Sequence, residues 1–281
     1  FDASCVQLEY GTRKAPPHSP FLQGFDMPSR FLSVALCLVS LSIPQAVHAD
    51  VTLPKIFGHN MVLQQNQPIQ VWGQASPGEE ITIDLNGTST QAIADNMGGW
   101  KAVLPARKAN GKTLTLTIKG DNEIKFNNIL MGEVWLGSGQ SNMEWSVKAA
   151  KDPAREIAAA KHPNIRLFKV QRARSATPAR DVVGQWQECA PDTIAGFSAT
   201  AYYFARELQQ ELDVPVGIIA SSWGGTRIEP WTPANGKNAV LYNAMIHPLA
   251  PFSIRGVIWY QGESNVLSKA GLKYHAMKKQ L

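Results

Sequence analysis

Residues 133–145 read EVWLGSGQSNMEW, an apolar run that stops at Gly-Ser-Gly and passes into polar residues. The pattern predicts a short buried strand, a tight turn that uses Gly137 and Gly139, and a helix headed by Ser141. A serine in that place directs its hydroxyl outward from the carboxyl end of a strand, beside backbone N–H groups that can receive an oxyanion. Acyl transfer requires this arrangement. A serine that merely caps the helix fits the same turn, so both interpretations stay open at this point.

Strands and helices alternate over residues 129–281. We expect strands at 165–170, 216–220 and 256–260, and an amphipathic helix at 200–212. Alternation of this kind is typical of βαβ units, so the sequence predicts an α/β fold with a mostly parallel sheet and flanking helices. The ligand crevice of such a sheet lies beyond the carboxyl ends of its strands.

Two further polar segments follow expected strands, SSWGGT at 221–226 and QGESN at 261–265. Because the carboxyl ends of parallel strands share one edge of the sheet, we expect both segments to meet Ser141. A Gly-Gly pair also fits a plain turn, and a glutamine fits a polar loop. The candidate donors for an oxyanion hole are the backbone N–H groups of Ser141, Gly224 and Gly225 and the side-chain amide of Gln261.

Four more residues in or beside these segments are candidates for the site. Glu263 follows an apolar strand, so its carboxylate could orient a catalytic histidine; a carboxylate that stabilises the turn is the alternative. Arg227 could pair with the carboxylate of an acidic sugar, or form a surface salt bridge with Glu229. Trp223 and Asn265 are candidates for substrate contact, although a tryptophan beside a strand end more often packs against the core.

Three blocks of this sequence resemble, in the same order, those of the sialate O-acetylesterases, a branch of the SGNH-hydrolase superfamily: GQSNMEW at 139–145, SSWGGT at 221–226 and WYQGESN at 259–265. The resemblance runs from Val51 to Leu281. It implies a flavodoxin-like, SGNH-type parallel sheet preceded by a small β-domain. It also implies a carboxylic ester hydrolase that uses Ser141 to form an acyl-enzyme and needs no metal or cofactor. The implied substrate is O-acetylated sialic acid, with acetylated xylan as the second choice.

The three blocks contain no general base. The resemblance implies a catalytic histidine well after the third block, often in an Asp-x-x-His motif, and no such motif follows Asn265. We therefore expect the histidine beyond Leu281, in a chain that is truncated at its C-terminus. His247 is the best internal candidate, although a structural role is the interpretation that we favour for it. If the chain truly ends at Leu281, a non-catalytic sugar-binding protein is the alternative function.

The N-terminal region is expected to carry an export signal. Residues 27–49 have a basic start, an apolar middle and a small-residue end, which is the pattern of a secretory signal peptide. Residues 1–26 resemble upstream sequence translated ahead of the true start, a non-native extension. No other long apolar run occurs. We therefore predict a secreted or periplasmic protein that has no membrane association once the leader is removed.

Residues 50–128 have a different pattern, in which short alternating strands are separated by turns rich in Gly, Asn and Pro. Regular spacing of such strands predicts a β-sandwich accessory domain ahead of a catalytic domain at 129–281.

Charge and cysteine content exclude some kinds of partner. The net charge is +5 over 281 residues, but Lys and Arg are scattered, so nucleic acid is not expected to bind. Only Cys189 lies outside the two N-terminal segments, and no Cys/His spacing is typical of zinc, so we expect no disulfide and no cofactor. The expected partner is an acetylated carbohydrate. The sequence leaves the oligomeric state open.

Overall fold

The computed structural model describes residues 49–267, 274 and 277–278, all of which belong to one compact unit. The predicted extension at 1–26, nearly all of the predicted signal peptide at 27–49, and the histidine expected beyond Leu281 lie outside the described residues. Within the described part of the chain, no helix has the length and apolar character needed to cross a membrane.

The first part of the described chain is built from short antiparallel strands. In β3 (Glu80–Leu85) the side chains of Ile81, Ile83 and Leu85 are buried and alternate with more exposed ones, because successive side chains of a strand point to opposite faces. The sheet order is β4–β3–β6–β7, and β2 pairs with β5. The other antiparallel strands here are β2 (Ile69–Gln74), β4 (Thr88–Ile93), β5 (Gly99–Leu104) and β6 (Leu114–Lys119), whereas β1 (Val62–Gln64) pairs parallel with the strand that follows β6.

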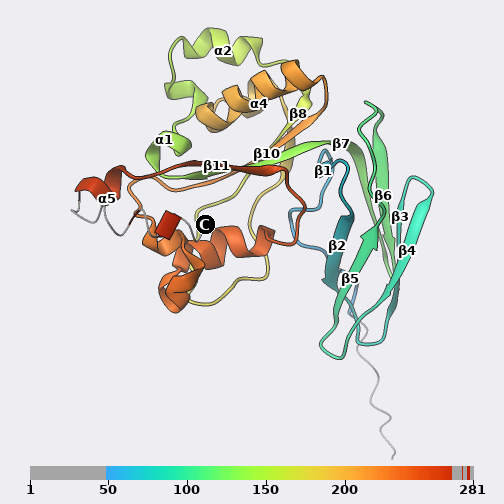
Figure 1. Ribbon diagram of the computed structural model, residues 1–281. Coiled ribbons are helices and arrows are strands. Elements are labelled where there is room, and N and C mark those ends of the chain that lie inside the picture. Colours follow the sequence, from blue (N-terminus) through green and yellow to red (C-terminus); the bar gives the residue numbers. More distant parts are fainter. Residues whose placement is uncertain (1–48, 268–273, 275–276, 279–281) are drawn as a thin grey trace, which may run out of the picture. The chain divides into compact units, whose positions relative to one another are not determined.

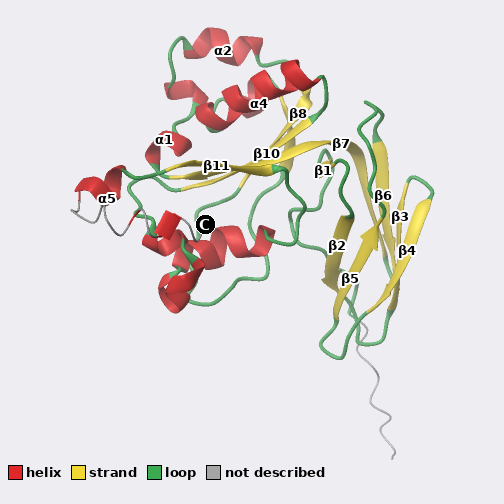
Figure 2. Ribbon diagram, in the orientation of Figure 1, coloured by secondary structure: helices red, strands yellow, loops and turns green. Residues whose placement is uncertain are grey.

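A single long strand, β7 (Glu123–Gly139), connects this part to the α/β part (Figure 2). Its first half pairs antiparallel with β6, and its second half pairs parallel with β1, β10 and β11. The predicted boundary at residues 128 and 129 therefore falls inside one strand. A separate β-sandwich domain at 50–128 stays a prediction.

The second half of β7 belongs to a mostly parallel sheet in the order β9–β8–β10–β7–β11, in which only β9 runs antiparallel to its neighbour. This confirms the predicted α/β fold with flanking helices. The strands are β8 (His162–Lys169), β9 (Trp186–Cys189), β10 (Val216–Ser222) and β11 (Gly256–Tyr260). The α-helices are α1 (Ser141–Glu144), α2 (Pro153–Ala159), α3 (Pro191–Ile194), α4 (Ala199–Leu212) and α5 (Glu263–Leu267).

Both faces of this sheet are covered, which explains why β10 is buried along its whole length. On one face, Ala201, Tyr202 and Ala205 of α4 pack against residues such as Ile218. On the other face lie short 3-10 and π segments between residues 229 and 249 (Figure 1). Trp231 from these segments is fully buried in the same core cluster as Ile219.

Candidate active site

Ser141 is placed by the end of β7. Gly139 has a φ of 140°, and a Cβ at this position would lie 2.1 Å from the carbonyl oxygen of Tyr260, so only glycine lets β11 approach. The N–H of Gln140 donates to the same carbonyl at 2.9 Å, and α1 begins at Ser141, whose side chain is exposed. The helix begins at Ser141 as predicted, whereas the strand before it is much longer than the short strand predicted. The tight turn at Gly137 is a wrong prediction, because β7 continues through it to Gly139.

The second block meets Ser141 as expected. Ser222, the last residue of β10, pairs with Gly139, and the N–H of Trp223 donates to the Gly139 carbonyl at 3.0 Å. A Cβ on Gly224 would lie 3.6 Å from the Cβ of Ser141, so the loop backbone lies against the serine. Gly225 follows with a φ of 75°, which favours glycine, and is exposed.

One of the predicted oxyanion donors, the N–H of Gly224, is already hydrogen-bonded to Glu144. The N–H of Gly224 donates to Oε2 of Glu144 at 2.8 Å, and Nε of Arg172 donates to Oε1 at 2.7 Å. Glu144 lies three residues after Ser141, so both face the same side of α1. Sequence reasoning missed Glu144 and Arg172 as site residues. The helical spacing from Ser141 was the available signal for Glu144, whereas Arg172 lies in a stretch without a recognisable pattern.

The third block reaches the same helix through Glu263. Its Oε1 accepts a hydrogen bond from Nδ2 of Asn142, the residue after Ser141. Its Oε2 is buried and has no hydrogen-bond partner among the described residues. Glu263 therefore lies beside the Ser141 helix with one acceptor oxygen uncommitted, which is compatible with the expected role of orienting a base.

Gln261 faces the protein interior and not the open site. It is 6% exposed, and its Nε2 lies 3.1 Å from Oε1 of Gln140 and 2.8 Å from Oδ1 of Asn265. A third oxygen, the Thr226 carbonyl, is 3.2 Å away. An amide nitrogen has two hydrogens, so in this structure protein oxygens engage both.

The expectation that Asn265 contacts substrate directly does not fit the structure, in which this residue is 0% exposed. Its Oδ1 accepts from the N–H of Ile228 at 2.9 Å, and its Nδ2 donates to Oε2 of Glu229 at 3.0 Å. Asn265 thus ties the third block to the segment that follows the Gly-Gly loop. A buried amide is positioned this way because each of its polar atoms needs a partner.

The two other substrate-contact candidates lie on the solvent side. Trp223 is half-buried, and the guanidinium groups of Arg172 and Arg174 lie 5.5 and 4.9 Å from its ring centroid. Arg227 is exposed and lines a cleft of about 430 Å³ together with Arg174 and Gly225. Direct contact of Trp223 or Arg227 with substrate stays a prediction.

No histidine among the described residues hydrogen-bonds to Ser141 or Glu263. The ring nitrogen Nδ1 of His247 lies 3.4 Å from the Ala179 carbonyl oxygen, and its ring packs at 6.1 Å from that of Tyr242. His247 lines a separate cleft of about 470 Å³. These contacts agree with the structural alternative for His247.

Two further observations concern metal ions and the thiol. The described residues contain no group of three or more His, Cys, Asp or Glu side chains close enough to hold a metal ion. Cys189 is buried at the end of β9, and this burial raises the pKa of its thiol to about 12. A thiol with such a pKa stays protonated at neutral pH and is a poor nucleophile.

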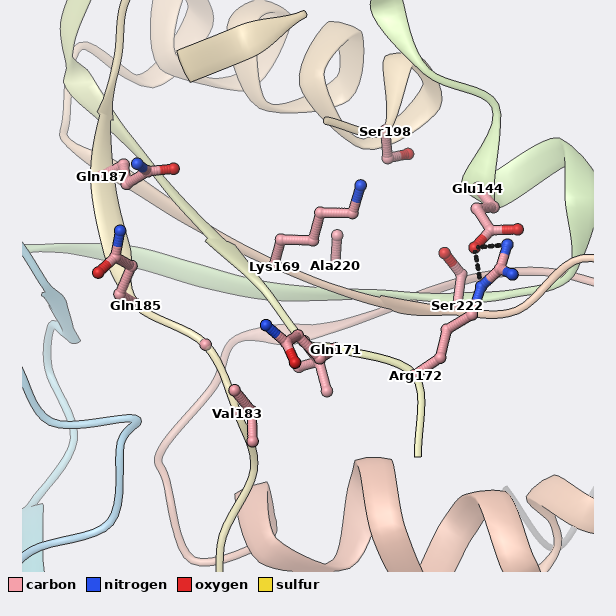
Figure 3. A pocket seen from close by; sticks show the side chains of 12 residues that line it. Glu144, Lys169, Gln171, Arg172, Val183, Gln185, Gln187, Ser198, Ala220 and Ser222 are labelled. Atoms are coloured by element: carbon pink, nitrogen blue, oxygen red, sulfur yellow. Dashed lines mark hydrogen bonds and ion pairs between the residues drawn. The ribbon is translucent and has the colours of Figure 1, made fainter. Parts of the chain in front are cut away.

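A pocket of about 770 Å³ opens beside α1, the helix that begins at Ser141 (Figure 3). Glu144 belongs to its wall, as do Lys169 at the end of β8 and Ser222 at the end of β10. The pocket is therefore at the carboxyl edge of the parallel sheet, where the sequence predicted the ligand crevice.

Comparison with known proteins gives consistent matches. Residues 131–281 match the family described as carbohydrate esterase, sialic acid-specific acetylesterase. Sialate O-acetylesterases from Pongo abelii and Homo sapiens are each 33% identical to this chain in an alignment of 252 positions, which covers 74% of this chain and 48% of theirs. A crystal structure of a carbohydrate acetylesterase from Xanthomonas citri is 40% identical, with a TM-score of 0.78, over 82% of this chain and 56% of that one. The chain spans about half the length of these relatives.

Proposed function

Since this chain belongs to the sialic acid-specific acetylesterase family of carbohydrate esterases, we propose that the protein removes O-acetyl groups from a carbohydrate with Ser141 as its nucleophile. The observation that carries the proposal is the meeting of three distant segments at this serine. Gly224 lies against Ser141, and Glu263 is hydrogen-bonded to Asn142 on the same short helix. A nucleophile, a backbone loop and a carboxylate are three of the parts that acyl transfer uses.

The proposed reaction has two steps. Oγ of Ser141 attacks the acetyl carbonyl carbon, a base takes the serine proton, and the proton passes to the sugar oxygen as the ester bond breaks. Water then attacks the acetyl-serine, which releases acetate and restores the hydroxyl. We assign the oxyanion to the N–H groups of Ser141 and Gly225, because Gly224 N–H donates to Glu144 and the Gln261 amide faces protein oxygens. The base in this proposal is a histidine outside the described residues, and the proposed role of Glu263 is to orient it.

The substrate we propose first is O-acetylated sialic acid, with acetylated xylan as the alternative. The names of the mammalian relatives support sialic acid. Arg227 is exposed beside the Gly-Gly loop and can pair with the carboxylate of an acidic sugar. Replacing Arg227 with Ala is then expected to lower the rate on sialyl acetate relative to xylosyl acetate; an unchanged ratio would remove Arg227 from this role.

We also propose that the protein is exported by the leader at residues 27–49. N-terminal sequencing of the protein purified from its host is expected to start near Asp50. A mature chain that retains residues 27–49 would contradict the export proposal.

The serine proposal is tested with protein produced from its complete gene and 4-nitrophenyl acetate as substrate. Ser141→Ala is expected to reduce kcat by at least about a thousandfold, because removal of a nucleophile leaves only binding and oxyanion stabilisation. Ser89→Ala, at an exposed position of β4, is the matched control and should keep the parent rate. A fully active Ser141→Ala protein refutes the mechanism. A folded parent protein without activity on any acetyl ester favours the sugar-binding alternative.

A further inference from the structure

The pocket of about 770 Å³ lies on the same edge of the sheet as Ser141, but Ser141 is not part of its wall. The two regions share Glu144, which is one helical turn after the serine. Ser222 in the pocket wall pairs with Gly139, two residues before Ser141. Figure 3 shows the ion pair between Glu144 and Arg172 in the pocket wall, and Glu144 belongs to α1, the helix that begins at Ser141.

Three glutamine side chains in the pocket wall are free to bind a ligand. None of the amides of Gln171, Gln185 and Gln187 is hydrogen-bonded to another residue in the described part of the chain. Figure 3 shows Gln185 and Gln187 on the side opposite Arg172. Each amide can donate two hydrogen bonds and accept others, and a sugar hydroxyl likewise donates and accepts.

The remaining wall suits the same kind of ligand. Nζ of Lys169 donates to the Gly196 carbonyl at 2.6 Å, and an ammonium group has two further hydrogens to donate. Val183 and Ala220 supply small apolar surfaces for the C–H faces of a sugar ring. The volume of about 770 Å³ lies within the usual range for small-molecule sites.

We propose that this pocket binds a sugar unit of the glycan, adjoining the acetylated unit held at Ser141, through the amides of Gln171, Gln185 and Gln187 and the ammonium of Lys169. This inference rests on the proposed function, because it makes the pocket a second subsite for the same substrate.

The kinetic test compares a large and a small substrate on the Gln185→Ala/Gln187→Ala double variant. The substrates are O-acetylated sialyllactose or acetylated xylotetraose, and 4-nitrophenyl acetate, which carries no sugar. Loss of the amide contacts is expected to lower the ratio of kcat/KM for the oligosaccharide to that for the small ester by about tenfold or more, chiefly through KM. Gln210→Ala, on the exposed side of α4, is the matched control and should leave the ratio unchanged.

A binding measurement separates failure of the pocket from failure of the proposed function. The Ser141→Ala protein, with and without the two glutamine changes, is titrated with unacetylated sialyllactose and xylotetraose while NMR signals of the sugars are followed. Binding that is weakened by the glutamine changes supports the pocket even if the parent protein hydrolyses no ester. The proposal is overturned if the ratio of the two kcat/KM values is unchanged in the double variant. It is also overturned if the protein binds neither sugar, or binds them equally well with and without the two glutamine substitutions.

Discussion

At the scale of single residues, the position of Glu144 requires an explanation. Its carboxylate accepts the N–H of Gly224, which lies against Ser141, so a negative charge lies close to the place where we propose that an oxyanion forms. Like charges at short range destabilise each other. Arg172 donates to the same carboxylate and offsets its charge. We therefore expect Arg172 to act as a positioning and neutralising residue for Glu144.

This role predicts an order of activities among three variants. Arg172→Gln leaves the charge of Glu144 uncompensated and is expected to lower kcat on 4-nitrophenyl acetate about threefold to tenfold, a modest effect because Arg172 is 51% exposed and solvent screens it. Glu144→Gln keeps an oxygen for the Gly224 N–H and should lose less. The double variant should recover most of the loss of Arg172→Gln. If the double variant is as slow as Arg172→Gln, neutralisation of Glu144 is not what Arg172 does.

The site was partly predictable at this scale. Ser141, Gly224 and Glu263 could be brought together because each follows an apolar strand, and parallel strands end at one edge. The burial of Asn265 could not be foreseen, since it depends on where the chain at Ile228 and Glu229 passes. The hydrogen bond from Gly224 to Glu144 depends on a side-chain rotamer, which strand and helix patterns do not specify.

At the scale of elements, buried strands were easier to predict than exposed ones. The expected strand at 216–220 is found as β10, which is buried on both faces. β4 cannot be recognised from its sequence, TSTQAI, because this sequence is mostly polar, none of its side chains is buried, and it therefore shows no apolar alternation. The full length of β7 was missed because Asn127 and Asn128, which favour turns, lie inside it.

Arg166 on β8 connects several elements and is 3% exposed. Its guanidinium donates to the carbonyls of Pro163 at 2.7 Å and Asn128 at 3.2 Å, and it pairs with Glu188 of β9 at 3.4 Å. Burial lowers the pKa of Arg166, while Glu188 opposes that effect. The cost of burying the cation is thus offset by contacts that fix β8 against β7 and β9.

Arg166→Met is expected to lower the free energy of unfolding by about 2–4 kcal/mol, because carbonyls now bonded to the guanidinium lose their partners. Chemical denaturation followed by circular dichroism measures the change. Arg155→Met, at an exposed position of α2, is the matched control and should differ little from the parent. Equal denaturation midpoints for Arg166→Met and Arg155→Met would show that the contacts of Arg166 do not stabilise the packing of β8 against β7 and β9.

At the scale of the whole molecule, β7 joins the antiparallel strands to the parallel sheet. Ile129 of β7 pairs with Leu114 of β6, and a few residues later Glu133 pairs with Val216 of β10. One core cluster contains Ile83 from the antiparallel part and Ile219 from the parallel sheet. A strand shared by two sheets transmits a loss of packing in one to the other, so we expect both parts to unfold together.

Hydrogen exchange in increasing denaturant tests this expectation, because it measures the protection of the backbone amides of β3 and of β10 separately. The amides of both strands should lose protection at the same denaturant concentration. Ile83→Ala, which removes a fully buried side chain, should lower both midpoints together, by an amount equal to about 2–5 kcal/mol. A different result, in which β3 exchanges first while β10 stays protected, would mean that residues 50–128 form an independent β-domain, as the sequence pattern predicted. The first half of β7 could then unfold while its second half stays paired in the parallel sheet.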